Sequence, residues 1–329
     1  MKILAIAPNW VGDMVMAQVL FKALKKLYGA DTIIDVVSQR WALSVASRMD
    51  EVRNLIEMKI AHGEFGLKKR YALGKLLRAE NYDLAIVMTI TFKSALIPFF
   101  AKIPIRAGHL GEIRFGLIND IKKIAIKRPR MIDKYMSLCD QGDREIAIEY
   151  PKLRVDLENQ KSLLARLGLN VDKPIAALFV GAEYGEAKRY SIGKFAVIAN
   201  KLIENGCQIW VFGSERDRSL GEELLLDSPK SVNLCGKTSL TDAIDLIALA
   251  KFAISNDSGL LHIAAAVGIN VIAIYGSSTS DYTPPLTDKK EIVSLNLPCS
   301  PCFKKRCPLK HLKCLRDLPP EMILERVKN

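Results

Sequence analysis

The sequence predicts an α/β protein made of two consecutive series of parallel β/α units, and three observations support this fold class. The chain has 329 residues, which is enough for two domains of roughly 150 residues each. Short, continuous apolar runs alternate with segments of helical periodicity, as in parallel sheets that helices cover on both faces. The alternation stops at a polar helical segment near the middle of the chain and then starts again.

In the first half of the chain, three apolar runs predict buried strands, at residues 3–7, 33–37 and 84–88. Residues 14–28, between the first two runs, are amphipathic and stop before Gly29, as a helix commonly does. The first run resembles the start of a signal peptide. Because Pro8 and Gly12 interrupt it, the run is too short for the apolar region of a signal peptide, and we interpret it as the first strand.

The second half restarts the pattern with four strand candidates, at residues 175–180, 208–212, 252–255 and 271–275. Helices are predicted between them at residues 192–204 and 240–250. The second of these helices starts at a capping box that runs from Ser239 to Asp242.

A polar helix at residues 158–167 ends at Gly168 and marks the boundary between the halves. We therefore expect two Rossmann-like domains, at residues 1–165 and 166–329, with the last helix as a candidate to pack back on the first domain. Open parallel sheets bind ligands at the carboxyl ends of their strands. Two such domains facing each other across a cleft would place the active site in that cleft.

The composition indicates a soluble protein with an anionic partner. The formal net charge of +12 at pH 7 fits nucleic acid, a membrane surface or a phosphorylated substrate. The most apolar later stretch, residues 260–275, contains His262 and Asn270 and falls short of a membrane-spanning helix. In the cytoplasm, which we expect here, the 7 cysteines are free thiols or metal ligands rather than disulfides.

Asp13 follows the first predicted strand, directly after Gly12 and at the start of the predicted helix. A carboxylate at this edge of a parallel sheet can accept a proton from a substrate hydroxyl, as a general base does. It can equally be an acidic residue in a first helical turn that interacts with the helix dipole. The position alone leaves both interpretations open.

Residues 256–262 (NDSGLLH) connect a predicted strand to an alanine-rich helix. The free backbone N–H groups of such a helix start can bind a phosphate, and His262 would add a donor. The other interpretation is an ordinary βα loop with a capping Asp257 or Ser258 and a packed histidine.

Two more polar, glycine-containing loops follow strands of the same half. In residues 180–189, two glycines precede Lys188 and Arg189, which suit a diphosphate. In residues 212–217, Asp217 is placed to accept hydrogen bonds from ribose hydroxyls. Each loop alone is also an ordinary surface turn. Three such loops at strand ends of one domain favour a nucleotide site.

Several motifs are missing from the chain. No Gly-x-Gly pair occurs, so the dinucleotide fingerprint is absent. Gly236, Lys237 and Thr238 resemble the end of a P-loop, but Ser231 stands where its first glycine belongs. A nicotinamide oxidoreductase and a P-loop kinase are therefore disfavoured.

A cluster of four cysteines and one histidine lies near the end of the chain, at Cys299, Cys302, Cys307, His311 and Cys314. Four thiols and an imidazole suit a tetrahedral zinc ion, although the spacing is not that of a standard paired knuckle. Ordinary buried or surface thiols are the other interpretation. We expect no catalytic metal and no cofactor.

Five short stretches of the sequence each give only a weak signal of a family, but together they are specific. They are residues 11–14 (VGDM), 92–96 (FKSAL), 111–116 (GEIRFG), 181–189 (GAEYGEAKR) and 256–262 (NDSGLLH). Taken in this order over nearly the whole chain, they resemble the lipopolysaccharide heptosyltransferases of glycosyltransferase family 9, closest to the heptosyltransferase II group. Residues 275–278 and 281–285 are similar to a late loop of that family.

The resemblance implies a GT-B fold, with an acceptor-binding first domain and a second domain that binds ADP-heptose. It implies inverting, metal-independent transfer of heptose to the first heptose of the lipopolysaccharide inner core. Asp13 matches the catalytic base, and Lys188 matches the group that stabilises the leaving diphosphate. The donor-binding residues it implies are Gly181, Ala182, Glu183, Lys188, Gly213, Asp217, Thr238, Asp257, Ser258, Gly259 and His262. The acceptor-binding residues it implies are Asp13, Lys93 and Arg114.

The expected partners are the ADP-heptose donor, the lipopolysaccharide inner core and, by peripheral contact, the cytoplasmic face of the inner membrane of a Gram-negative bacterium, without nucleic acid. Some positions depart from the family pattern, such as Val180 before the loop glycine and the segment 89–91 before Phe92. The alternatives are another GT-B transferase with a different acceptor or donor, and a basic nucleic-acid-binding protein with a Cys/His metal site.

Overall fold

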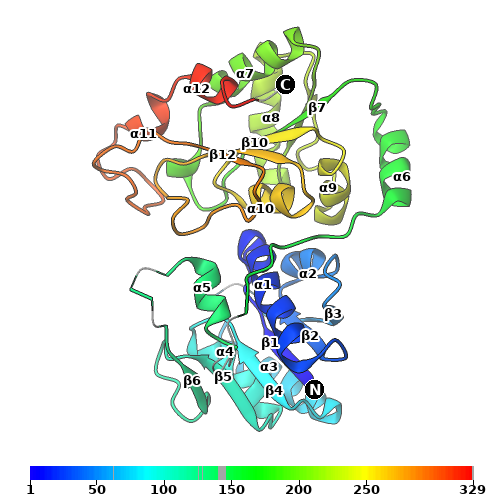
Figure 1. Ribbon diagram of the computed structural model, residues 1–329, viewed down its shortest axis with the longest axis vertical. Helices are drawn as coiled ribbons and strands as arrows, with labels where there is room; N and C mark the ends of the chain where they lie inside the picture. Colours follow the sequence, from blue (N-terminus) through cyan, green and yellow to red (C-terminus); the bar gives the residue numbers. More distant parts are fainter. Residues whose placement is uncertain (62, 125, 128, 140–145, 328–329) are drawn as a thin grey trace. The chain divides into compact units, whose positions relative to one another are not determined.

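The computed structural model describes residues 1–61, 63–124, 126–127, 129–139 and 146–327. The chain forms two compact units, Met1–Pro151 and Lys152–Asn329. Each unit has its own sheet, and in the described residues each sheet has six strands, all of them parallel (Figure 1).

The first unit alternates strands with helices from its first residues onward. Its strands are β1 (Lys2–Ile6), β2 (Ile33–Ser38), β3 (Val52–Glu57), β4 (Leu84–Val87), β5 (Ile105–His109) and β6 (Asp120–Lys122). Its helices are α1 (Val11–Tyr28), α2 (Arg40–Ala46), α3 (Leu67–Leu77), the 3₁₀ turn η1 (Arg78–Glu80), α4 (Phe92–Phe100) and α5 (Met131–Met136).

The strands of the first sheet follow the order β3-β2-β1-β4-β5-β6. β1 and β4 are entirely or almost entirely buried, because both faces of the sheet are covered. Helix α1 packs against α2 and α5, and α3 packs against α4. Apolar side chains of β1, β4, α3 and α4 form one continuous core.

The second unit repeats this construction. Its strands are β7 (Ile175–Phe179), β8 (Gln208–Phe212), β9 (Val232–Asn233), β10 (Phe252–Asn256), β11 (Asn270–Ile274) and β12 (Lys290–Val293). Its helices are α6 (Leu157–Leu167), η2 (Glu186–Lys188), α7 (Ile192–Glu204), η3 (Glu215–Asp217), α8 (Arg218–Asp227), α9 (Leu240–Ile247), α10 (Gly259–Ala266), α11 (Lys313–Arg316) and α12 (Pro320–Leu324).

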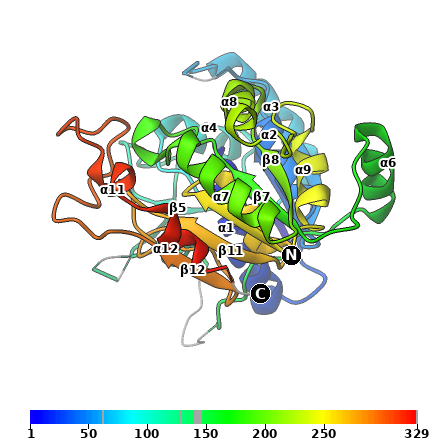
Figure 2. The same ribbon diagram turned by 90° about the horizontal axis from the view of Figure 1, so that it is seen from above.

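The second sheet has the strand order β12-β11-β10-β7-β8-β9. Helices α7, α8 and α12 cover one face of it, and their apolar residues share a core with β7, β8 and β10. Figure 2 shows α7 and α12 side by side on the same face of this sheet. The last described helix thus packs on α7, within its own unit.

The division between the units falls after Pro151, earlier than the boundary at residue 165 that the sequence suggests. Helix α6 belongs to the second unit because it packs against α9 (Figure 2). The fully buried carboxylate of Asp245 in α9 accepts hydrogen bonds from the backbone N–H of Asp156 (2.8 Å) and from Nδ2 of Asn159 (2.7 Å). These hydrogen bonds, together with the buried Leu163, tie the polar helix to the second unit.

The predicted α/β fold class is confirmed, and so are the seven predicted strands and the four predicted helices, with ends that differ by at most three residues. Strands β3, β5, β6, β9 and β12 were not expected. These strands lie at or next to a sheet edge, where a strand has no neighbouring strand on one side. Their sequences are short or partly polar, so they do not form a long apolar run. No helix of the described residues is long and apolar enough to cross a membrane.

Candidate active site

The second sheet has its topological switch point between β7 and β10. From β7 the chain runs outward to β8 and β9, and it then returns to β10 on the other side of β7. The loops at the carboxyl ends of β7 and β10 therefore depart in different directions and leave room for a ligand. Lys188 from the first loop and Asp257 from the second meet at this point, with 2.5 Å between Nζ and Oδ2.

Asp257 is buried and has a second partner. Oγ of Ser278, in the loop after β11, donates a hydrogen bond of 2.5 Å to the same Oδ2 that pairs with Lys188. Three neighbouring strand ends thus meet at one carboxylate. Ser278 was not among the predicted site residues, although the stretch 275–278 follows a predicted strand in the same way as the other loops.

Asn256 fixes the geometry of the loop that carries Lys188. The side chain is fully buried at the end of β10. Its Nδ2 donates to the carbonyl of Val180 (2.9 Å), and its Oδ1 accepts from the backbone N–H of Tyr190 (2.9 Å). One amide therefore holds both ends of the segment between residues 180 and 190, which sequence reasoning did not assign.

Helix α10 starts at Gly259, and Ser258 at its N-cap makes no side-chain capping hydrogen bond. The N–H groups of the first turn are therefore available to an anion. His262 lies one turn further and is buried. Burial lowers the pKa of His262 to about 4, a shift that Asp257 opposes and Lys188 reinforces. His262 is thus neutral near pH 7, and among the described residues its Nδ1 has no hydrogen-bond partner.

Asp217 lies against two of the predicted glycines. Its Oδ2 accepts hydrogen bonds from the backbone N–H (2.9 Å) and Oγ (2.7 Å) of Ser214. A Cβ atom on Gly181 would lie 2.5 Å from Cγ of Asp217, and one on Gly213 would lie 2.7 Å from its Cβ. Both glycines are therefore needed for the carboxylate to reach the ends of β7 and β8.

The other predicted donor residues of this unit surround the same strand ends. Ala182 is buried, and the exposed Glu183 accepts a hydrogen bond from Nη1 of Arg216 (2.5 Å). Thr238 is half-buried in the loop after β9. That loop lies beside the Gly213 loop, since the backbone N–H of Gly236 donates to the carbonyl of Gly213 (3.2 Å).

Tyr184 supports the Lys188 side chain from the same loop. Nζ of Lys188 lies 4.9 Å from the centroid of the Tyr184 ring, and Nζ of Lys305 lies 5.8 Å from it. Cations at these distances are attracted by the face of an aromatic ring. The tyrosine hydroxyl donates to the carbonyl of Phe303 (2.8 Å). Segment 303–305 is therefore in contact with the loop that carries Lys188.

The first unit has its switch point between β1 and β4. Asp13 lies in the first turn of α1, after β1, and Lys93 lies at the start of α4, after β4. Both side chains are half-buried. The structure therefore places these two predicted acceptor residues at neighbouring strand ends, since β1 and β4 pair directly. Asp13 in a first helical turn still fits both of its interpretations.

Arg114 has a different setting from the one its predicted role suggests. Its side chain is 1% exposed. Nε donates to the carbonyl of His109 (3.1 Å), and Nη1 donates to the carbonyl of Thr89 (2.8 Å) and to Oγ of Ser94 (3.3 Å). Arg114 therefore holds the segment that leads into α4 and Lys93, and we treat it as a positioning residue.

Comparison with known proteins decides the family. The model of glycosyltransferase family 9 (heptosyltransferase) matches residues 70–313. The chain belongs to glycosyltransferase family 9. Among relatives in this family, lipopolysaccharide heptosyltransferase 2 of Salmonella typhimurium is 40% identical over 99% of this chain and 97% of its own length. Lipooligosaccharide heptosyltransferase 2 of Haemophilus influenzae is 41% identical over 99% and 98%.

A solved structure of the family agrees with the fold. The structure of ADP-heptose lipopolysaccharide heptosyltransferase II of E. coli matches with a TM-score of 0.88 and 36% identity, over 99% of this chain and 97% of that one. The predictions of family 9 membership, of the GT-B fold and of a glycosyltransferase are confirmed.

Proposed function

We propose that this family 9 enzyme transfers heptose from ADP-heptose to the first heptose of the lipopolysaccharide inner core, with inversion and without a catalytic metal. The Lys188–Asp257–Ser278 cluster at the switch point, together with the open start of α10, carries this proposal. Relatives whose names specify heptosyltransferase 2 match over the full chain, and this similarity supports the choice of donor and acceptor.

The second unit binds the donor. The diphosphate takes the place between Lys188 and the first N–H groups of α10, where a cation and a helix start attract negative charge. The neutral His262 adds a hydrogen bond from its buried ring. Asp217 accepts from the ribose hydroxyls. As the bond between C1 of the heptose and the phosphate oxygen breaks, charge develops on ADP, and these donors stabilise it electrostatically.

The first unit binds the acceptor and activates it. The acceptor oxygen attacks C1 from the face opposite ADP, and its proton passes to the carboxylate of Asp13. A positioned general base contributes typically 10²–10⁴-fold to the rate. Lys93 contacts the anionic acceptor, and Arg114 keeps the strand ends around Lys93 in place. Assignment of the acceptor role to residues 1–151 and of the donor role to residues 152–329 is part of this proposal.

The test compares wild type, Asp13→Ala and Asp31→Ala, an exposed aspartate of the same unit that serves as the matched control. Each is incubated with ADP-heptose and a lipopolysaccharide acceptor that ends in one heptose, with no added divalent ion, and products are measured by mass spectrometry. We expect one heptose added by wild type and Asp31→Ala, and at least about 10²-fold less by Asp13→Ala. Wild type that binds ADP-heptose but adds no heptose would contradict the acceptor assignment.

We also propose peripheral contact with the cytoplasmic face of the inner membrane, through the first unit. Large apolar side chains are exposed at the carboxyl end of its sheet, with Ile90 58%, Ile113 81% and Phe115 67% exposed. Combined with the net charge of +12, they suit an anionic lipid surface. Ile113→Ser with Phe115→Ser should reduce sedimentation with anionic vesicles, whereas Leu226→Ser, at an 83% exposed position of α8, should not. Equal binding by both variants would contradict this contact.

A further inference from the structure

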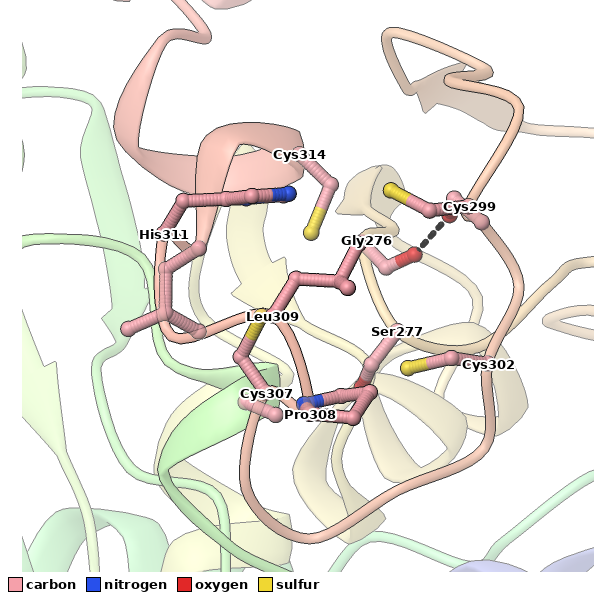
Figure 3. Close-up of a pocket in the computed structure, with 12 residues that line it drawn as sticks. Gly276, Ser277, Cys299, Cys302, Cys307, Pro308, Leu309, His311 and Cys314 are labelled. Carbon is pink, nitrogen blue, oxygen red and sulfur yellow. Dashed lines mark hydrogen bonds between the residues drawn. The ribbon is translucent and has the colours of Figure 1, made fainter.

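The proposed transfer reaction leaves one side-chain cluster of the second unit unused. Four cysteines and one histidine line a single pocket behind the loop that carries Lys188, together with Gly276 and Ser277 (Figure 3). They are Cys299, Cys302, Cys307, His311 and Cys314. All four cysteines are free thiols. Figure 3 shows Cys299, Cys302 and Cys307 on the loop around the pocket and Cys314 in helix α11 at its edge.

The four thiols gather around one pocket. Cysteines make up four of the twelve residues that line this pocket. Thiols that only fill a core do not need to gather in this way, since a single cysteine packs like any small apolar side chain. A group of four around one pocket instead provides the ligand set of a thiolate-binding metal ion.

His311 lines the same pocket but is not suited to be a ligand. Its Nδ1 accepts a hydrogen bond of 3.0 Å from the backbone N–H of Lys313. In a neutral imidazole the other nitrogen, Nε2, then carries the proton and has no lone pair for a metal. The four thiolates thus form the ligand set, with the spacing C-x2-C-x4-C-x6-C.

We propose that Cys299, Cys302, Cys307 and Cys314 bind one structural Zn²⁺ ion in tetrahedral geometry. Among the residues that the structure describes, no three His, Cys, Asp or Glu side chains are already arranged around a common metal position. Binding therefore requires rotation of the cysteine side chains toward the pocket, until the sulfur atoms lie at the Zn–S distance of about 2.3 Å. Such a closed, four-ligand site leaves no position for substrate and is structural.

The ion would stabilise the loop that carries Lys188. The metal-binding segment contacts that loop through the backbone N–H of Ala187, which donates to the carbonyl of Lys305 (3.1 Å), and through the hydroxyl of Tyr184, which donates to the carbonyl of Phe303 (2.8 Å). The backbone N–H of Phe303 donates to the carbonyl of Ser277 (2.7 Å). This consequence for Lys188 rests on the proposed donor site, whereas metal binding itself does not.

The test measures zinc and iron by plasma mass spectrometry in the full-length protein, purified under reducing conditions and reconstituted with Zn²⁺. We expect one zinc per chain in wild type, in His311→Ala and in the control Cys207→Ser, whose half-buried thiol lies outside the segment. Cys302→Ser and Cys314→Ser should lose the ion. Thiol titration of the native protein should show more reactive cysteines after a chelator has removed the ion than before it.

Wild-type protein that remains free of metal after reconstitution would overturn the proposal, and so would a disulfide within residues 299–314 of the reduced, native protein. Zinc lost from His311→Ala but kept by Cys302→Ser would overturn the four-thiolate ligand set. One iron per chain would keep the site and overturn the choice of zinc. Because none of these readouts uses heptose transfer, they are independent of the proposed function. In the transfer assay, loss of the ion should raise the KM for ADP-heptose more than it lowers kcat.

Discussion

Lys188 and Asp257 are joined by an ion pair of 2.5 Å across the switch point of the second sheet. A lysine ammonium on a flexible stem has many conformations, and this pairing selects one of them. Asp257 is in turn held by the hydroxyl of Ser278. The cation that we assign to the leaving diphosphate is therefore positioned by a carboxylate and a hydroxyl from two other strand ends.

Ser278→Ala should lower kcat by about tenfold. The hydrogen bond to the carboxylate is charge-assisted, and such bonds contribute about 1.5–3 kcal/mol. A loss of about 1.4 kcal/mol of transition-state stabilisation lowers the rate tenfold. Because Ser278 acts through Asp257, we expect Ser278→Thr to restore part of the rate. The steady-state rate of transfer at saturating ADP-heptose measures this effect.

Ser277→Ala provides the matched control for that experiment. The neighbouring hydroxyl is buried and has no hydrogen-bond partner among the described residues. Its removal should therefore leave kcat within about twofold, since no interaction is lost. If Ser277→Ala and Ser278→Ala lower kcat by the same factor, the effect comes from a change in the whole loop and not from the loss of the hydrogen bond to Asp257.

Gly181→Ala should weaken donor binding at the ribose. The added methyl group would lie 2.5 Å from the carboxylate carbon of Asp217, so either the loop or Asp217 has to move. We expect the KM for ADP-heptose to rise by about tenfold or more, in line with the cost of about 1–3 kcal/mol for overpacking. Gly193→Ala in α7 is the control, because its Cβ meets only Oγ of Ser191 at 4.0 Å. Gly193→Ala should leave the KM for ADP-heptose unchanged.

Arg114→Lys should destabilise the first unit by about 2–4 kcal/mol. The buried guanidinium donates to the carbonyls of His109 and Thr89 and to Ser94, and a lysine cannot reproduce this planar set of donors. The carbonyls left without a donor each cost about 1–3 kcal/mol. Urea unfolding measures the change, with Arg40→Lys at an exposed position as the control. An unchanged stability together with a loss of acceptor affinity would instead make Arg114 a direct ligand of the acceptor.

The periodicity of the sequence predicted the buried strands of both sheets because a strand covered on both faces has an apolar run of its own. It did not predict β9 and β12, since these strands at the sheet edges are short or partly polar. The same limit applies to the site. Asp13, Lys188 and Asp257 follow predicted strands, so the sequence alone could place them at strand ends. The hydrogen bond from Ser278 to Asp257 joins residues 21 positions apart and depends on β11 lying beside β10.

Asn256 and Arg114 show a second reason why part of the site escapes sequence reasoning. Asn256 lies within the NDSGLLH stretch, but its side chain forms hydrogen bonds with the backbone of Val180 and Tyr190. Because every residue has the same backbone groups, the sequence does not indicate which of them a side chain will bind. The family resemblance implied that Arg114 binds the acceptor. Its burial follows from carbonyl groups that the loop turns inward, which only the folded backbone reveals.

The pH dependence of stability should reveal the neutral state of His262. Burial lowers its pKa to about 4, while an unfolded chain has a histidine pKa of about 6.5. Between these two values the unfolded state binds a proton that the folded state does not bind. The free energy of unfolding must therefore rise with pH across this window and become independent of this group above it, by about 1.4 kcal/mol per unit of pKa difference.

His262→Asn removes the titrating group while keeping a polar side chain in the same place. The difference in free energy of unfolding between wild type and this variant should increase from about pH 4 to about pH 6.5 and then stay constant, because only wild type gains stability as the histidine of its unfolded state deprotonates. Denaturant unfolding at several pH values measures this difference. A difference that falls over the same interval would mean that His262 is charged in the folded protein, and would contradict its assignment as a neutral hydrogen-bond donor to the diphosphate.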